Sequence, residues 1–293
     1  MPGLLVAMPS TCILTDSTAC FSRAAYPGQE HVHQIPFQIL VGDTRIPDSK
    51  ELGCLTPQKP GQRSTPVKPC PPEVDAFQRM YASLGQTYQH IVVILISSQL
   101  CTAVENALQA AETPKSPAAL HIIDSQTCAL GLGILVQTAA EAIQRGLPAS
   151  EITRLVRGLT RHIYSVFCLP DLTNLAQAGQ LDPAQALVGE MLGVLPLFIM
   201  ENGRLVHTQK IRSPRNMVDI MYEFIAEFDH LRHLALLQGM PFFDLESRNL
   251  RERIHQYIRA VPYSEHTLPL SLASILGPRA IGLTAVESVL KEV

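Results

Sequence analysis

Apolar and polar residues alternate in blocks along this chain, and the blocks have the lengths of strands and helices. Residues 91–96 form a run of six apolar side chains, Ile-Val-Val-Ile-Leu-Ile, which leaves no face for solvent and predicts a strand buried on both sides. Shorter strand-like runs occur at residues 12–14 and 120–124. Segments with helical spacing of apolar residues separate or follow these runs, at residues 73–84, 100–111, 128–145 and 148–159. This alternation predicts a parallel sheet between two helical layers.

The pattern changes after about residue 158. Asn202-Gly203 lies between two strand-like runs, which is a strong signal for an antiparallel hairpin. We expect strands at residues 163–169, 194–200, 204–211, 231–237 and 269–276, and helices at residues 172–178, 183–192, 214–228 and 246–258. The predicted fold class is therefore α/β with two domains. Residues 1–158 form a three-layer α/β/α domain with a parallel sheet, and residues 159–293 form an α+β domain with a mixed sheet.

The segment between the first strand and the first helix has a different character. Residues 34–41 predict a second strand that ends in a turn at Gly42-Asp43. Residues 43–72 are rich in proline, glycine, serine and threonine and have no apolar period, so we expect a long surface loop. The loop ends at Pro69-Cys70-Pro71-Pro72, where three prolines remove three amide donors.

Small polar residues follow each of the predicted parallel strands. Because the carboxyl ends of parallel strands meet at one edge of a sheet, we expect these side chains to lie together. Hydroxyls and the unpaired N–H groups of helix starts suit an anionic oxygen. The alternative is that these residues only cap the helices that follow. The residues concerned are Asp16, Ser17, Ser97, Ser98, Asp124 and Ser125.

Composition and charge narrow the class of protein. The 293 residues carry a net charge of −3, with 23 basic and 26 acidic residues mixed along the chain, which disfavours a nucleic-acid-binding protein. The seven cysteines are scattered without a C-x-x-C pair, unlike a disulfide framework or a zinc site. The first residues lack the basic and long apolar regions of a signal peptide, and no apolar run could span a bilayer. We expect a cytoplasmic protein without membrane insertion.

Two further groups of residues raise other chemistries. His230 and His233 lie beside acidic residues, but the sequence offers no third strong metal ligand, so we predict no metal site. Cys101 lies near a predicted helix start, which would lower the pKa of its thiol. No base can be identified beside Cys101 or Cys70. We therefore predict no catalytic residue and no cofactor, and a cysteine nucleophile remains a minor alternative.

Several motifs together resemble one protein family. Residues 13–19 (Ile-Leu-Thr-Asp-Ser-Thr-Ala) and 96–103 (Ile-Ser-Ser-Gln-Leu-Cys-Thr-Ala) resemble motifs of the DegV family of fatty-acid-binding proteins. Further matches follow in the family's order over nearly the whole chain: Asp124-Ser125 with Gly131 and Gly133, residues 172–181, residues 192–196, Asn202-Gly203, Lys210 with Arg212, and Gly277-Pro278. The order of these motifs predicts the same two-domain fold.

The resemblance also implies a function. It implies a non-catalytic carrier that holds one long-chain fatty acid or a similar amphiphile between its domains, with the carboxylate near the hydroxyls and the tail in an apolar tunnel. Relatives in some bacteria present the bound acid to a separate fatty-acid kinase subunit, so such a subunit is an expected partner. The ligand-binding residues implied in this chain are Asp16, Ser17, Cys70, Ser97, Ser98, Cys101, Thr102, Arg212 and Ile275.

The chain departs from the family pattern where the head group would bind. The family's Thr-Ser-Gln-Pro is replaced by residues 69–72, its Ser-Gly by Cys101-Thr102, its Gly-Gly-Arg by residues 178–180, and its His-Thr-Gly-Pro-Gly by residues 275–279. A charged hydrogen bond contributes about 1.5–3 kcal/mol, so the lost arginine and histidine would lower carboxylate affinity by about 10²–10⁴. A divergent relative with another small ligand, a neutral lipid or only a protein partner is the alternative.

Overall fold

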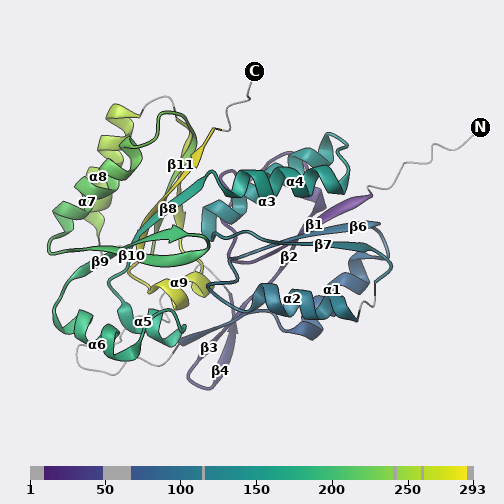
Figure 1. Ribbon diagram of the computed structural model, residues 1–293, viewed down its shortest axis with the longest axis horizontal. Helices are drawn as coiled ribbons and strands as arrows, with labels where there is room; N and C mark the ends of the chain where they lie inside the picture. The colour runs from purple at the N-terminus through teal and green to yellow at the C-terminus, as the bar shows by residue number, and fades with distance from the viewer. Residues whose placement is uncertain (1–9, 49–66, 114–115, 240–242, 259–260, 289–293) are drawn as a thin grey trace, which may run out of the picture.

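The computed structural model describes residues 10–48, 67–113, 116–239, 243–258 and 261–288. Within these residues the chain forms three β-sheets (Figure 1). The N-terminal part, up to residue 160, contains the four-stranded sheet A and the three-stranded sheet B. The C-terminal part, from residue 161, contains the six-stranded sheet C. The predicted division after residue 158 would fall in the last turn of helix α4 and stays a prediction.

Sheet A is the parallel sheet that the apolar runs predicted. Its strand order is β2-β1-β6-β7, and every neighbouring pair is parallel. Helices α1 and α2 cover one face and helices α3 and α4 the other, so the predicted three-layer arrangement is confirmed (Figure 1). The elements are β1 Thr11–Asp16, β2 Val32–Ile35, β6 His90–Leu95, β7 Ala119–Asp124, α1 Val74–Leu84, α2 Ala103–Glu112, α3 Ala129–Gln144 and α4 Ala149–Thr160, with a short helix η1 at Gln29–His31.

Sheet B corrects two predictions. The predicted strand at residues 34–41 is two strands, because the chain leaves sheet A after Ile35 and Pro36 has no amide hydrogen to continue the ladder. The predicted loop at residues 43–72 contains two further strands, while its residues 49–66 lie outside the described residues. The antiparallel order is β4-β3-β5, with β3 Gln38–Val41, β4 Thr44–Pro47 and β5 Val67–Cys70. Strand β5 lies at the sheet edge, where its proline is tolerated.

Sheet C is mixed, as predicted for the second half. Its order is β10-β9-β8-β13-β11-β12, in which β11 and β12 are parallel and the other pairs antiparallel. The β9–β10 hairpin turns at Asn202 and Gly203, whose φ angles of 49° and 82° are typical of this turn. The strands are β8 Ile163–Cys168, β9 Leu195–Glu201, β10 Arg204–Ile211, β11 Leu231–Gln238, β12 Tyr263–Thr267 and β13 Ile281–Glu287.

The prediction of a final strand at residues 269–276 is wrong. The segment is the buried helix α9, Leu270–Leu276, which ends at Gly277 with a φ of 93°. A short run of apolar residues that is buried all round has no period to separate a strand from a helix. Strands β12 and β13 were not predicted.

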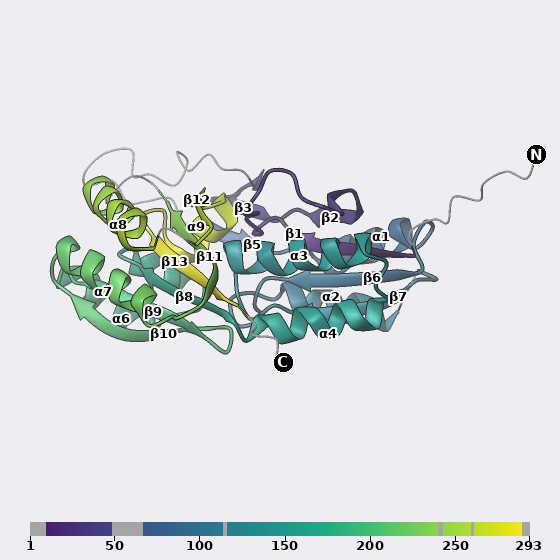
Figure 2. The same ribbon diagram turned by 90° about the horizontal axis from the view of Figure 1, so that it is seen from above.

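The other helices of the C-terminal part cover both faces of sheet C. Helices α7 (Pro214–Ala226) and α8 (Asp244–Tyr257) pack on one face. Helices α5 (Leu172–Gln177), α6 (Pro183–Met191) and α9 lie on the other (Figures 1 and 2). None of the described helices is long and apolar enough to cross a membrane.

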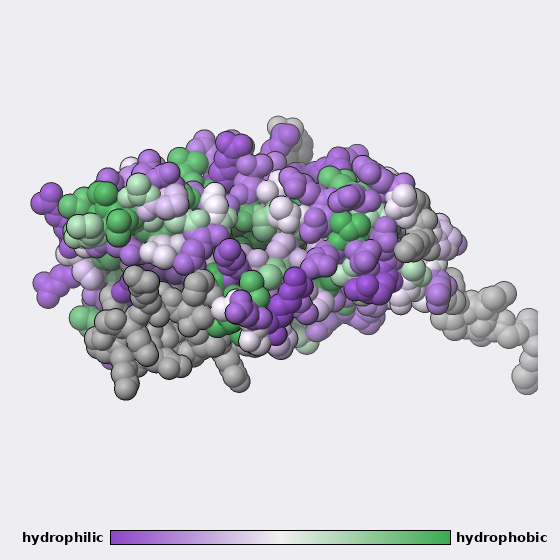
Figure 3. Space-filling view, turned by 90° about the horizontal axis from the view of Figure 1, so that it is seen from below, coloured by the Kyte–Doolittle hydropathy of each residue, from purple (hydrophilic) through white to green (hydrophobic). Residues whose placement is uncertain are grey.

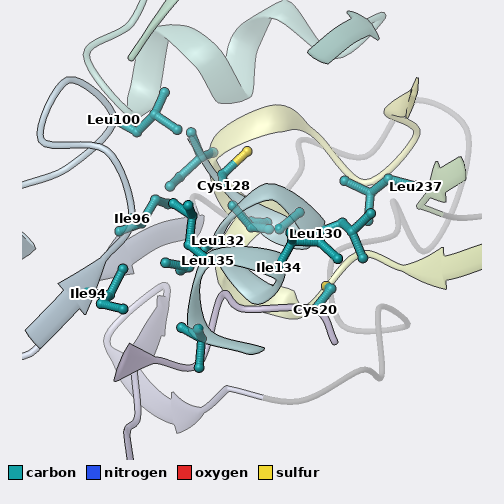
Figure 4. Close-up of a cluster of buried hydrophobic side chains, with 14 of the residues drawn as sticks. Cys20, Ile94, Ile96, Leu100, Cys128, Leu130, Leu132, Ile134, Leu135 and Leu237 are labelled. Atoms are coloured by element: carbon teal, nitrogen blue, oxygen red, sulfur yellow. The ribbon is translucent and has the colours of Figure 1, made fainter. Parts of the chain in front are cut away.

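One apolar cluster joins the two parts of the molecule. Helix α3 contributes Leu130, Leu132 and Ile134, which are buried between side chains of both parts (Figure 4). Leu100, beyond the end of β6, and Leu237, in β11, belong to the same cluster. The carboxyl edge of sheet A is therefore held against the C-terminal part by a continuous core.

Candidate functional site

The predicted polar residues gather at the carboxyl edge of sheet A. Strands β1, β6 and β7 are neighbours in the sheet, so Asp16, Ser97 and Asp124 follow or end adjacent strands. The Cys101 thiol lies close enough to Asp16 and Asp124 for both carboxylates to raise its pKa. The structure thus brings together residues that are more than 100 positions apart in the sequence.

Asp16 organises this edge from below the surface. Its side chain has no exposed surface, and its Oδ2 accepts a hydrogen bond from the Ile96 N–H at 2.8 Å. Its Oδ1 accepts from the Thr18 N–H at 2.9 Å and the Thr18 hydroxyl at 2.5 Å. Burial raises the pKa of the Asp16 carboxyl, while these hydrogen bonds oppose the rise and nearby Asp48 adds to it. Asp16 therefore holds the ends of β1 and β6 together.

Ser17 belongs to a second group that reaches helix α9. Its hydroxyl donates to Asp48 Oδ2 at 2.6 Å and accepts from the Phe37 N–H at 3.0 Å. Asp48 also accepts from the Ser271 N–H at 2.9 Å and from the Ser271 hydroxyl at 2.6 Å. Asp48 and Ser271 were not predicted as site residues, because a single aspartate in a polar segment carries no local signal of a partner 223 positions away.

Ser97 and Ser98 point in different directions. The buried Ser97 hydroxyl donates to the Gly203 carbonyl, in the β9–β10 turn, at 2.8 Å. The partly exposed Ser98 hydroxyl donates to Asp124 Oδ2 at 2.5 Å, and its N–H donates to Asp124 Oδ1 at 3.2 Å. Ser98 and Asp124 therefore face the accessible side of this edge, whereas Ser97 serves the junction between the two parts.

The turn at residues 97–101 is held by side chains of the C-terminal part. Arg204 donates through Nε to the Gln99 side-chain oxygen at 2.7 Å. Gln180, which follows α5, donates to the Gln99 carbonyl at 3.0 Å and to the Leu100 carbonyl at 3.4 Å. The resemblance would place an arginine where Gln180 stands, so an amide now makes this contact with the turn.

Cys101 and Cys70 do not have the features of nucleophiles. Burial, with smaller contributions from Asp16, Asp124 and Glu105, raises the pKa of the Cys101 thiol to about 12, although the Ala103 N–H opposes this. The thiol therefore stays protonated at neutral pH, contrary to the expectation for a helix start. Cys70 is partly exposed at the end of β5, where its thiol contacts the Lys68 carbonyl at 3.9 Å. Cys54 lies outside the described residues.

The remaining predicted site residues have varied positions. Thr102 is exposed before α2, and its hydroxyl makes no cap hydrogen bond. Ile275 is fully buried in α9. Arg212 is exposed after β10 and makes no side-chain hydrogen bond or ion pair with a residue that the structure describes. Their roles stay predictions.

The residues considered for a metal are not arranged as a metal site. His233 bonds through Nε2 to the Ser264 hydroxyl at 2.8 Å, and burial lowers its pKa to about 4. Within the described ranges, no three histidine, cysteine, aspartate or glutamate side chains cluster closely enough to hold a metal ion.

An apolar groove adjoins this edge. It has a volume of about 580 Å³ and lies between α5 and α6 on one side and the β9–β10 hairpin on the other. Leu181 lines the groove directly beside Gln180, which bonds the turn at residues 97–101, so one end of the groove meets the polar edge. Its lining is Leu172, Leu181, Ala184, Gln185, Val188, Gly189, Leu192, Val194, Pro196, Phe198, His207 and Lys210.

Helix α6 also exposes apolar side chains outward. Leu187, Val188, Met191 and Leu192 are between 55% and 78% exposed. Apolar residues gather at the end of the molecule where α6 lies (Figure 3). Ala186 is the buried residue of this helix. Helix α6 is therefore a loosely covered wall of the groove.

Residues 10–288 match the sequence profile of the family described as "Uncharacterised protein, DegV family". The chain belongs to the DegV family. Protein DegV of Bacillus subtilis is 26% identical over 218 residues, which cover 73% of this chain and 76% of that protein. A DegV domain-containing protein of Staphylococcus aureus is 26% identical over 225 residues, covering 76% of this chain and 80% of its own.

Solved DegV-family structures have the same fold. A fatty-acid-binding DegV protein of Thermus thermophilus superposes with a TM-score of 0.78 at 22% identity, covering 95% of this chain and 100% of that one. A fatty-acid-binding DegV protein of Streptococcus agalactiae gives 0.80 at 17% identity, covering 95% and 99%. The Fatty Acid Kinase (Fak) B3 protein of Streptococcus pneumoniae, loaded with linoleic acid, gives 0.79 at 18% identity, covering 95% and 100%.

Proposed function

We propose that this DegV-family protein is a non-catalytic carrier of a long-chain fatty acid or a similar single-chain amphiphile. The observation that supports this most directly is the apolar groove that ends at the polar edge of sheet A. Such a combination suits a molecule with a long apolar tail and one polar end. The fatty acids bound by the Thermus, Streptococcus agalactiae and Streptococcus pneumoniae relatives support the same ligand class.

The groove can take up a substantial part of an acyl chain. Its volume of about 580 Å³ is within the usual range of about 300–1,000 Å³ for small-molecule pockets. Each methylene group removed from water contributes about 0.8 kcal/mol. Ten buried methylenes therefore contribute about 8 kcal/mol before the entropic cost of binding. Tail burial alone can thus give useful affinity.

The polar end of the ligand would lie at the carboxyl edge. Ser98 and Thr102 are the accessible hydroxyls nearest to the turn that Gln180 holds. The Cys101 thiol lies near the Asp16 and Asp124 carboxylates and remains protonated. This arrangement provides hydrogen bonds but no activated nucleophile, which supports a carrier and not a covalent catalyst.

A kinase subunit is the proposed partner. The similarity to the B3 protein of a fatty acid kinase supports this, because that protein shares the fold over nearly its whole length. In this proposal the present chain holds the amphiphile and the partner supplies the phosphoryl-transfer chemistry.

Two variants of helix α6 test the carrier function. Val188 lines the groove, whereas Leu187 does not, and both are more than half exposed. Delipidated protein is titrated with oleic acid and with oleyl alcohol, and native mass spectrometry counts the bound molecules. We expect Val188→Glu to lower affinity at least tenfold because its charge meets the acyl chain, and Leu187→Glu to bind as the parent does. Equal affinities of the two variants, or no bound amphiphile in the parent, would contradict the proposal.

A further inference from the structure

The hydroxyl groups at the candidate head-group site already donate their protons to the protein. A serine hydroxyl has one proton to donate and two lone pairs that accept. Ser17 and Ser271 donate to the Asp48 carboxylate, Ser98 donates to Asp124, and Ser97 donates to the Gly203 carbonyl. These four hydroxyls therefore offer a ligand lone pairs and not protons.

Carboxylates dominate the charge at the same edge. Asp48 raises the pKa of Asp16, and Asp16 and Asp124 both raise the pKa of Cys101, so the three carboxylates influence one region. Arg204 is a cation near this edge, and its Nε already donates to Gln99. A bound carboxylate would add a further negative charge close to Asp124, where like charges disfavour one another.

The free polar groups do not favour an anion. The exposed Thr102 hydroxyl makes no cap hydrogen bond and can donate or accept. The Cys70 and Cys101 thiols are weak donors. A hydroxyl or amide head group can use Thr102 as well as a carboxylate can, and in addition it can donate to the Ser98 lone pairs and to the Asp124 oxygens.

From this donor and charge pattern, and resting on the proposed carrier function, we propose that the protein prefers an amphiphile with an uncharged head group that donates hydrogen bonds. A long-chain alcohol or amide fits this description. The acyl carboxylate is the disfavoured form. The altered motifs at residues 69–72, 101–102 and 178–180 agree with this change, because they place prolines, thiols and an amide near the head group in place of charged and hydroxyl donors.

The test compares ligands that share one chain. Isothermal titration calorimetry of the delipidated protein at pH 8 uses dodecanoate, 1-dodecanol and dodecanamide below their solubility limits. We expect the alcohol and the amide to bind at least about tenfold more tightly than the carboxylate, a difference of about 1.4 kcal/mol. Equal or tighter binding of dodecanoate would overturn the head-group preference and leave the carrier function standing. No binding of any of the three would overturn the carrier function and this proposal with it.

Asp124→Asn provides a sharper arm. The oxygen of the introduced amide could keep accepting the Ser98 and Gln126 N–H groups, both of which bond Oδ1 of Asp124. The amide nitrogen would then donate to the Ser98 hydroxyl, which frees the Ser98 proton for a ligand while one negative charge disappears. We expect dodecanoate affinity to rise at least fivefold relative to 1-dodecanol, with an unchanged thermal midpoint showing that the fold is intact.

Two further variants separate the causes. Glu112→Gln removes the same charge at the exposed end of α2 that lies farthest from the carboxyl edge, and we expect it to leave the ratio unchanged. Arg204→Gln tests whether the arginine supplies an anion site. A loss of dodecanoate binding in Arg204→Gln, or no change of the ratio in Asp124→Asn, would count against the proposal.

Discussion

Replacement of Gly203 by alanine should weaken the junction between the hairpin and sheet A. Gly203 has a φ of +82°, and an added Cβ would lie 2.4 Å from the Ser97 hydroxyl oxygen. The left-handed backbone costs a non-glycine residue about 1–2 kcal/mol. Displacing Ser97 also breaks its hydrogen bond to the Gly203 carbonyl, which contributes about 0.5–1.5 kcal/mol. We therefore expect Gly203→Ala to lower the free energy of unfolding by about 2–3 kcal/mol.

Gly146→Ala is the matched control. Gly146 has a similar φ of +79°, and an added Cβ would meet no atom within 4 Å. Its substitution should therefore cost only the backbone strain of about 1–2 kcal/mol. The excess cost at Gly203 measures the contact with Ser97. In the double variant Ser97→Ala/Gly203→Ala the clash disappears, so the two changes should be coupled by about 1 kcal/mol.

Urea unfolding followed by far-UV circular dichroism gives these free energies, since the chain has no tryptophan to report on unfolding. Equal costs for Gly203→Ala and Gly146→Ala, together with additive effects in the double variant, would refute the reasoning. That result would mean that the hairpin turn does not press on Ser97 in solution.

Three further predictions concern other regions. Gly158 lies inside α4 with open space around its missing side chain, so Gly158→Ala should raise the free energy of unfolding by about 1 kcal/mol in the same urea titration; a loss would contradict the open environment. Burial lowers the pKa of His233 to about 4, so the unfolded chain takes up a proton first and stability should fall as the pH drops from about 6.5 to about 4. In His233→Gln this part of the pH dependence of the urea midpoint should be absent, and an unchanged slope would exclude His233 as its cause. Iodoacetamide at pH 8 should alkylate Cys101 in the folded protein at least about tenfold more slowly than Cys70, because the raised pKa of Cys101 leaves little thiolate; peptide mass spectrometry measures both rates, and faster labelling of Cys101 would contradict its burial.

Elements with a local signal could be predicted from the sequence. Residues 91–96 have no polar position and became the buried centre of sheet A. Asn202-Gly203 gave the hairpin because these residues tolerate the positive φ angles of its turn. The regular strand–helix alternation placed Asp16, Ser98 and Asp124 at one edge, since parallel neighbours end on the same side.

Contacts that depend on distant segments could not be predicted. Nothing near Asp48 indicates that it accepts hydrogen bonds from Ser17 and Ser271, because these partners come from β1's end and from α9. The same holds for the Ser97 hydroxyl, which could have capped the helix after it and instead bonds the Gly203 carbonyl. Helix α9 was mistaken for a strand because burial on all sides erased its period.

The contrast between helices α3 and α6 determines how a guest molecule would enter the groove. Nearly every residue of α3 is buried between the two parts, whereas in α6 only Ala186 is buried. Separating the two parts would expose the apolar side chains of α3 to water, at about 25 cal/mol for each Å² uncovered. Swinging α6 outward would expose far less. The energetically cheaper doorway is therefore the outer wall of the groove, and a disulfide that tied α6 to the hairpin would slow loading without altering the resting fold.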